Sequence, residues 1–197
     1  MKLKRIVTGD LKANCYILID DATQHAIIID PGANFSAINK ELIGTNPLLI
    51  LLTHGHYDHI GAVSELKSAY KGLIVCIGAA DAELLQDSKK NMGYWSNQHI
   101  KSFTEDKLLS GNDEINFCNS KIKTLATPGH TQGSTCYFIN GLLFSGDTLF
   151  KGATGRTDLY GGNQSDLTQS INRLKKLNPQ TIVYPGHGLK TTIGAKI

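Results

Sequence analysis

The chain has 197 residues, of which 41% are hydrophobic and 19% are charged, and its formal net charge is +3. This length suits one domain with a substantial core, so we expect a single domain over residues 1–197. The positive excess is too small and too scattered to predict a nucleic-acid binder, and the longest aliphatic run, residues 48–52, is too short to span a membrane.

Strand and helix patterns follow one another along the first half of the chain. Two apolar runs joined by the polar turn DDATQ predict a hairpin. The expected strands cover residues 2–7, 14–19, 25–30, 48–52 and 73–77, and the expected helices cover residues 35–43, 61–70 and 79–86. Residues 87–107 have no periodicity and contain the single tryptophan, so this segment is either a surface excursion or a substrate lid.

The second half repeats the order of strands first and a helix later. Asn140-Gly141, between two apolar runs, predicts a type I′ hairpin because both residues accept positive φ angles. The expected strands cover residues 114–118, 121–126, 134–140, 141–145 and 181–185, and the expected helix covers residues 165–177. Two such halves predict an α/β fold with two facing sheets and helices outside them, a four-layer αββα sandwich.

Four cysteines lie in apolar, strand-like segments: Cys15, Cys76, Cys118 and Cys136. None belongs to a C-x-x-C pair, and the first residues lack the apolar run and the cleavage site of a signal peptide. We therefore expect four buried, reduced thiols in a cytoplasmic protein.

The sequence HGHYDH begins at His54, separated by one residue from the apolar run at residues 48–52. His54 and His56 are two residues apart, which places them on one side of an extended segment, whereas Asp58 and His59 need a bend to point together. Such a cluster is poor core material, because each group needs a partner and protonated histidines repel one another. A divalent cation resolves the conflict by accepting several neutral imidazole nitrogens.

Three later loops present a similar side chain after an apolar strand and a glycine. They carry His130 in TPGHTQGS, Asp147 in FSGDTLF and His187 in YPGHG. Five histidines and two carboxylates exceed one tetrahedral sphere and suffice for two ions that share a bridging carboxylate. His25 and His99 lack this context, and we expect them to be surface or strand residues.

The ordered set THGHYDHIG, TPGHTQGS, SGDTLF and YPGHG resembles the metallo-β-lactamase fold superfamily, and within it the short hydrolases related to glyoxalase II. IIIDPG, which contains Asp30, and GRTDLYGG at residues 155–162 extend the resemblance to nearly the whole chain. It implies the αββα fold and two metal sites with a shared ligand. The implied ligands are His54, His56 and His130 for the first metal, Asp58, His59 and His187 for the second, and Asp147 as the bridge.

The implied activity is that of a binuclear metal-dependent hydrolase, glyoxalase II-like, that cleaves a small thioester or other acyl substrate with a metal-bridging hydroxide as the nucleophile. Asp58 is expected both to bind the second metal and to orient the nucleophile. We expect two divalent ions, zinc before iron or manganese. Candidates for outer partners of the ligands, or else local turn caps, are Asp30, Thr53 and Thr131. Candidates for substrate contacts are Tyr94, Trp95, Arg156 and Thr157.

Differences from the sequence motifs of related enzymes restrict the expected activity. Zinc β-lactamases resemble this chain but place a cysteine at the position of Asp147. Ten residues follow His187, so we expect the glutathione-binding C-terminal domain of glyoxalase II to be absent. GRTD also resembles persulfide dioxygenases with one iron, although YPGHG favours the hydrolases. Such a dioxygenase, and a hydrolase of lactones or other esters, are the alternatives.

Overall fold

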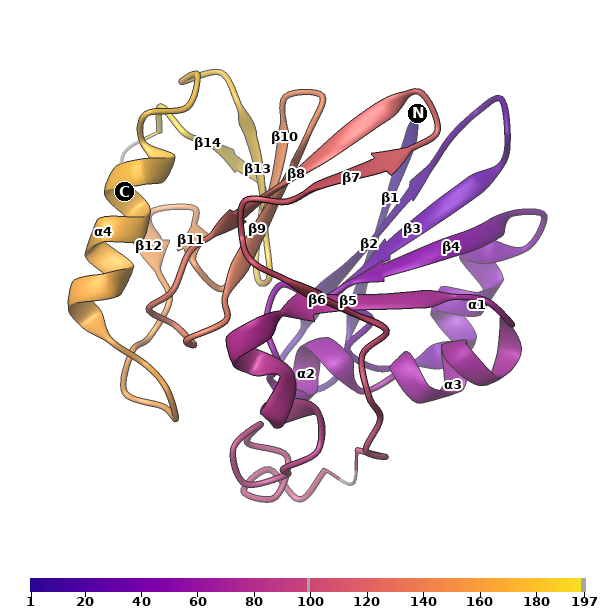
Figure 1. Cartoon of the computed structure of the whole chain (residues 1–197), viewed down its shortest axis with the longest axis horizontal. Coiled ribbons are helices and arrows are strands. Elements are labelled where there is room, and N and C mark those ends of the chain that lie inside the picture. Colours follow the sequence, from indigo (N-terminus) through magenta and orange to yellow (C-terminus); the bar gives the residue numbers. More distant parts are fainter. Residues whose placement is uncertain (99, 196–197) are drawn as a thin grey trace.

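Two sheets of six strands face each other in the computed structural model, which describes residues 1–98 and 100–195 (Figure 1). The first sheet has the strand order β1-β2-β3-β4-β5-β6 and the second has the order β14-β13-β10-β9-β8-β7. The strands of the first sheet are β1 (Lys2–Thr8), β2 (Ala13–Ile19), β3 (His25–Ile29), β4 (Asn46–Leu51), β5 (Ile74–Gly78) and β6 (Lys107–Leu109). Those of the second are β7 (Glu114–Phe117), β8 (Ser120–Ala126), β9 (Thr135–Ile139), β10 (Leu142–Gly146), β13 (Ile182–Pro185) and β14 (Thr191–Thr192).

Helices cover the outer faces of both sheets, which confirms the four-layer αββα sandwich (Figure 1). The helices are α1 (Phe35–Leu42), α2 (Tyr57–Ile60), α3 (Val63–Ala69), the 3₁₀ helix η1 (Ala79–Leu85) and α4 (Gln164–Leu174). A small ribbon of β11 (Leu149–Phe150) and β12 (Ala153–Thr154) precedes α4. The helices α1 and α3 pack on the first sheet and α4 packs on the second.

Strand β2 illustrates how the sequence builds these layers. All seven of its residues are buried, because both faces of its sheet are covered. Cys15 and Ile17 face the core beneath the helices, whereas Tyr16 and Leu18 face the core between the sheets. This alternation follows from the two-residue period of a strand. The hairpin expected around DDATQ is confirmed, since β2 and β3 pair antiparallel.

Several details differ from the sequence prediction. Within the helix expected at residues 79–86, Ala79–Leu85 forms a 3₁₀ helix, and residues 191–192, for which no strand is predicted, form the edge strand β14. The expectation of four buried thiols is wrong for Cys118, which is exposed. It occupies the tight turn between β7 and β8 with a φ of 50°, where its sulfur lies at the surface, 3.3 Å from the Thr23 hydroxyl.

The long segment between η1 and β6 has no helix or strand in its described part, residues 87–98 and 100–106. It is attached to the site loop by a backbone hydrogen bond of 2.9 Å from the Tyr57 amide to the Asn91 carbonyl. Tyr94 and Trp95 project from it, with 58% and 66% of their surfaces exposed. The expected position of His99 lies outside the described residues.

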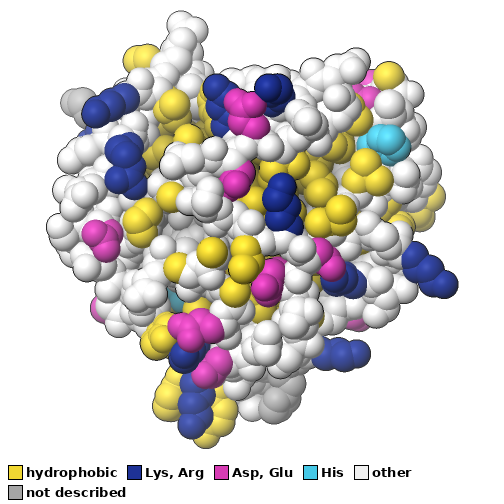
Figure 2. All heavy atoms as spheres, in the orientation of Figure 1, with side chains coloured by type: hydrophobic (Ala, Val, Ile, Leu, Met, Phe, Trp, Pro, Cys, Tyr) yellow, Lys and Arg dark blue, Asp and Glu magenta, His cyan; other side chains and the backbone are white. Residues whose placement is uncertain are grey.

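None of the described helices combines the length and the apolar character needed to cross a bilayer. Lys and Arg side chains alternate with Asp and Glu over the face that Figure 2 shows, and neither sign forms a broad patch there. This distribution matches the small net charge of the sequence.

Candidate metal centre

Seven candidate ligands gather at the edge of the sandwich where strands of both sheets end. They are His54, His56, Asp58, His59, His130, Asp147 and His187. The first four follow β4 or lie on α2, and the fifth lies between β8 and β9. Asp147 directly follows β10, and His187 comes two residues after the end of β13. A backbone hydrogen bond of 2.8 Å from the Thr135 amide to the Thr53 carbonyl joins the two sheets beside the cluster.

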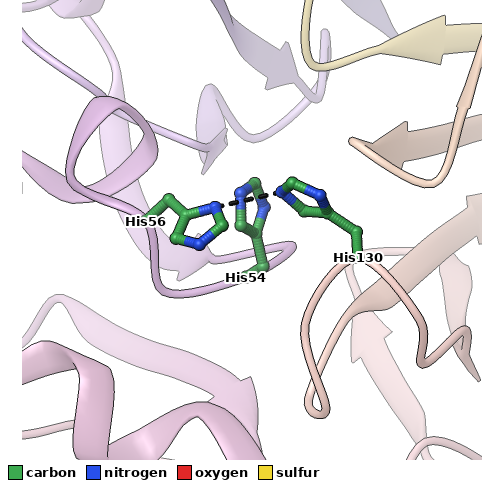
Figure 3. A group of neighbouring side chains, drawn as sticks. All are labelled: His54, His56 and His130. Carbon is green, nitrogen blue, oxygen red and sulfur yellow. Dashed lines mark hydrogen bonds between the residues drawn. The ribbon is translucent and has the colours of Figure 1, made fainter. Parts of the chain in front are cut away.

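The first group consists of three buried histidines, His54, His56 and His130, whose rings converge from two loops (Figure 3). Their possible ligand atoms all lie within 4.8 Å of one another. His56 Nδ1 and His130 Nε2 are 3.0 Å apart. Burial lowers the pKa of His54 well below its ordinary value and that of His56 to about 3, so these rings are neutral and offer lone pairs.

The second group consists of Asp58, His59 and His187, which also lie within 4.8 Å of one another. Asp58 Oδ2 is 3.2 Å from His187 Nε2 and 3.5 Å from His59 Nε2. Asp147 reaches both groups, because its Oδ1 is 3.5 Å from His59 Nε2 and its Oδ2 is 3.7 Å from His130 Nε2. The arrangement therefore has two triads and one carboxylate between them.

Buried polar atoms without partners mark the same place. Among the described side chains, His54 Nε2, His56 Nε2, His59 Nε2 and Asp147 Oδ1 are buried and make no hydrogen bond, as does one further atom, Asn14 Oδ1. An unsatisfied buried polar group costs about 1–3 kcal/mol. A divalent cation that accepts the lone pairs of His54 Nε2, His59 Nε2 and Asp147 Oδ1 would remove that penalty for these three atoms, so the residues present fit a binuclear metal site.

Negative charge is concentrated around His59. Burial alone lowers the pKa of this histidine, but Asp58, Asp147 and Asp30 together outweigh burial and raise it to about 10. The same carboxylates that favour a proton on His59 would also favour a divalent cation. The first triad thus offers neutral nitrogens, and the second triad adds the negative charge.

Outer partners fix the orientation of four rings. Asp30 Oδ2 accepts hydrogen bonds from His59 Nδ1 at 3.0 Å and from the Thr53 hydroxyl at 2.6 Å, and that hydroxyl lies 3.1 Å from His54 Nδ1. The Nδ1 atoms of the other two rings, those of His130 and His187, face backbone carbonyls at 2.8 and 3.0 Å. Such partners hold the opposite nitrogen of each ring toward the cluster.

The sequence prediction for the outer partners needs one correction. Asp30 and Thr53 contact the histidines, but the hydroxyl of Thr131 donates to Asp81 at 2.7 Å instead. The carbonyls that hold His130 and His187 belong to Arg156 and Leu11, and a backbone atom leaves no signal in a sequence. Asp81 was missed because it lies in an ordinary helical pattern, AADAELLQ.

A recess of about 310 Å³ adjoins the second triad. Its lining residues include Asp10, Tyr57, Asp58, Glu65 and Gln98. Gln98 also lines a larger recess of about 410 Å³ formed by the segment at residues 86–102, so this excursion provides one wall beside the metal centre.

The four candidates for substrate contacts lie apart from that recess. Tyr94 lines the larger recess, whereas Trp95 lies beside it with its ring edge-on to that of Tyr94. The Arg156 guanidinium is exposed and forms two hydrogen bonds of 2.7 Å with Asp158. The Thr157 hydroxyl bonds to Gln164 at 3.2 Å.

Comparisons with known proteins agree with this geometry. Residues 8–187 match the sequence profile of the Metallo-beta-lactamase superfamily. The chain is 39% identical to the "Probable metallo-hydrolase YqgX" of Bacillus subtilis, covering 98% of this chain and 93% of the relative. It is 32% identical to the "Hydroxyacylglutathione hydrolase GloC" of Haemophilus influenzae, covering 98% of this chain and 94% of that protein.

Two solved structures share the fold closely. BLEG-1, described as a B3 metallo-beta-lactamase, superposes with a TM-score of 0.92 at 36% identity, covering 98% of this chain and 95% of that chain. TTHA1623, solved in a di-iron-bound form, superposes with a TM-score of 0.85 at 32% identity, covering 97% and 95%.

Proposed function

The chain belongs to the Metallo-beta-lactamase superfamily and is a metal-dependent hydrolase of that family, and within it we propose a two-metal enzyme that hydrolyses small thioesters. The observation that carries the proposal is the pair of triads joined by Asp147. Seven ligands arranged in this way exceed the needs of one ion and match the needs of two.

We assign the first ion to His54, His56 and His130, and the second to Asp58, His59 and His187, with Asp147 shared. Two divalent cations held there would supply a hydroxide at neutral pH and would offset the negative charge of an oxyanion. Asp30 restricts the ring of His59, so its Nε2 stays directed at the cluster. Zinc, iron and manganese are all compatible with nitrogen and oxygen ligands of this kind, and zinc is our first choice.

The partners of the cluster histidines support a substrate with a thiolate leaving group. Four histidines have one ring nitrogen in the cluster and the other beside a fixed partner, and the unpaired Nε2 of His56 is buried. With both ions bound, these histidines would be neutral ligands, and none would donate a proton to a departing group. A thiolate leaves without such a donor, whereas an amine or an alkoxide needs one.

The relatives support thioesters as the substrate class and also suggest an alternative activity. The name of GloC specifies a thioester of glutathione, and this chain covers 94% of that protein. BLEG-1 is described as a β-lactamase and is 36% identical, so β-lactam hydrolysis is the second candidate. The GRTD segment at residues 155–158 supports a third, persulfide oxidation with a single iron.

A substrate panel separates these activities. We expect the purified, metal-loaded protein to release thiol from neutral acyl thioesters and S-lactoylglutathione, to consume no oxygen with glutathione persulfide, and to hydrolyse β-lactams far more slowly. Thiol release is followed with a chromogenic reagent and oxygen with an electrode. Oxygen uptake that exceeds thioester cleavage would replace the hydrolase with the dioxygenase, and faster turnover of β-lactams would make the second candidate correct.

A further inference from the structure

A buried carboxylate lies behind the first triad and belongs to none of the groups assigned so far. Asp81, on η1, is fully buried and accepts three hydrogen bonds. Its Oδ2 accepts from the Gly55 amide at 2.9 Å and from the Thr131 hydroxyl at 2.7 Å. Its Oδ1 accepts from the Gly133 amide at 2.7 Å.

These donors come from the two loops that supply the first triad. Gly55 lies between His54 and His56 in the loop after β4, whereas Thr131 directly follows His130 in the loop between β8 and β9. One carboxylate therefore connects a loop of the first sheet with a loop of the second. In Figure 3 the three rings meet between those two loops, so their separation determines how far apart the ring nitrogens lie.

The packing around η1 leaves little freedom at these contacts. A Cβ added to Gly133 would lie 2.7 Å from the Asp81 side chain and 2.5 Å from its amide nitrogen. A Cβ added to Gly55 would lie 2.6 Å from the Cβ of Leu84, one turn further along η1. The backbone of each loop thus packs directly on η1 at a glycine, and Asp81 lies between the two loops.

We propose that Asp81 is a positioning residue that sets the geometry of the first metal triad by holding the two loops together. The second triad has its own buried carboxylate, Asp30, which accepts from His59. Through the Thr53 hydroxyl Asp30 also reaches His54 of the first triad, whereas the contacts of Asp81 are confined to the two loops that carry the first triad. This inference rests on the proposed function, because it uses the ligand assignment given there.

Substitution of Asp81 by asparagine tests this positioning role, because the two side chains have nearly the same size and shape. An amide offers one acceptor and one donor group, whereas Asp81 faces backbone amides with both oxygens. In either orientation the new NH₂ group points at the N–H of Gly55 or of Gly133, so one of the two loops is released. We expect the separation of His56 and His130 to change, while His59 and His187 keep their partners.

Zinc affinity is measured by chelator competition in two variant proteins, each of which keeps only one triad intact, so that the affinity of each triad is measured separately. His187→Ala disrupts the second triad, and the ion that remains reports on the first. His130→Ala disrupts the first triad, and the ion that remains reports on the second. Adding Asp81→Asn is expected to weaken zinc binding about 10–100-fold in the His187→Ala background, the usual effect of losing an outer partner, and by less than about two-fold in the His130→Ala background.

Matched variants keep the test decisive if Asp81→Asn folds poorly. Thr131→Val removes one donor to Asp81, and we expect a loss of about five-fold, again only in the His187→Ala background. Thr127→Val is the control, because Thr127 is a buried threonine of the same loop whose hydroxyl lies 3.0 Å from Thr148 and makes no bond to Asp81. It should leave both affinities unchanged.

The outcomes separate the two proposals. An unchanged affinity in the His187→Ala background, or equal losses in both backgrounds, would overturn the role of Asp81 alone. A His187→Ala protein that binds no zinc would instead contradict the ligand assignment, and the proposed function and the Asp81 proposal would fall together.

Discussion

At the scale of single residues, Asp147 lies between the two triads. Its carboxylate lies within 3.7 Å of histidines from both triads, and its Oδ1 is one of the buried atoms without a hydrogen bond. The residue follows β10 directly after Gly146, whose positive φ of 49° turns the chain at this point. A carboxylate placed in this way can serve two ions at once.

Replacing Asp147 by alanine should therefore affect catalysis far more than folding. We expect kcat for a thioester to fall at least 100-fold, beyond the 10–100-fold range typical of an outer partner, because a shared ligand positions both ions. The thermal midpoint of the metal-free variant should stay close to that of the metal-free wild-type protein. Near-normal turnover with two ions bound would show that Asp147 is not the bridge.

The four cysteines should differ sharply in reactivity. Burial raises the pKa of Cys76 and of Cys136 to about 11 and that of Cys15 well above its ordinary value, so these thiols stay protonated and inaccessible. Cys118 is exposed in its turn. We expect a maleimide to label one thiol rapidly in the native protein, and Cys118→Ser to abolish that phase. Rapid labelling of two or more thiols would contradict the burial described here.

The sequence predicted which seven side chains the fold brings together, but it predicted only some of the groups that hold them in place. Histidines after strands carry a strong chemical signal, because few other uses of such clusters are stable. Asp81 carries none, since an aspartate in a short helical pattern is usually exposed. Leu11 and Arg156 contribute carbonyl groups, which any residue could provide.

At the scale of elements, the loops after the strands approach one another closely enough to require glycine. Gly186 precedes His187, and a Cβ at this position would lie 2.2 Å from Asp147 Oδ1 and 2.8 Å from His59 Cε1. Its amide also donates to the Gly146 carbonyl at 2.8 Å. The loop after β13 thus packs directly on the shared carboxylate.

Gly186→Ala should consequently damage the metal centre without unfolding the protein. Displacement of a reacting group by about 1 Å can lower the rate about 100-fold, and we expect a loss of that order in kcat. Gly188→Ala is the control, because Gly188 has a φ of +76° but open space, so it should cost about 1 kcal/mol of stability and little activity. Equal activity losses in the two variants would show that crowding at Asp147 is not the cause.

The predictability of the elements depended on how much apolar surface each one buries. Strands such as β2 and β4 are covered on both faces, and their apolar runs identified them within one or two residues. The helix α2 has four residues and β14 has two, which is too short for any periodicity to emerge. Their formation depends on contacts with neighbouring strands that the local sequence does not specify.

At the scale of the whole molecule, charge around the recess beside the second triad bears on the substrate. Asp10 and Glu65 line this recess together with Asp58, and its described lining includes no lysine or arginine. Glutathione carries two carboxylates, so a glutathione thioester that occupied this recess would meet like charge. Neutral thioesters of similar size do not meet this repulsion.

Reversing one of these charges should change the preference between the two kinds of thioester. We expect Asp10→Lys to lower KM for S-lactoylglutathione about five-fold, the scale of one exposed charge contact, and to leave KM for a neutral thioester unchanged. Asp21→Lys, in the exposed turn at the other end of β2, is the control for net charge. An equal response to both substitutions would mean that the recess does not hold the glutathione portion.

The number of metal ions required for activity tests the central claim most directly. The metal-free protein is titrated with zinc while the initial rate of thioester hydrolysis is recorded. Because the structure assembles two triads around one shared carboxylate, we predict that the rate rises until two equivalents of zinc are bound per chain and is constant thereafter. A rate that reaches its maximum at one equivalent, and does not increase when a second ion binds, would contradict the two-metal account.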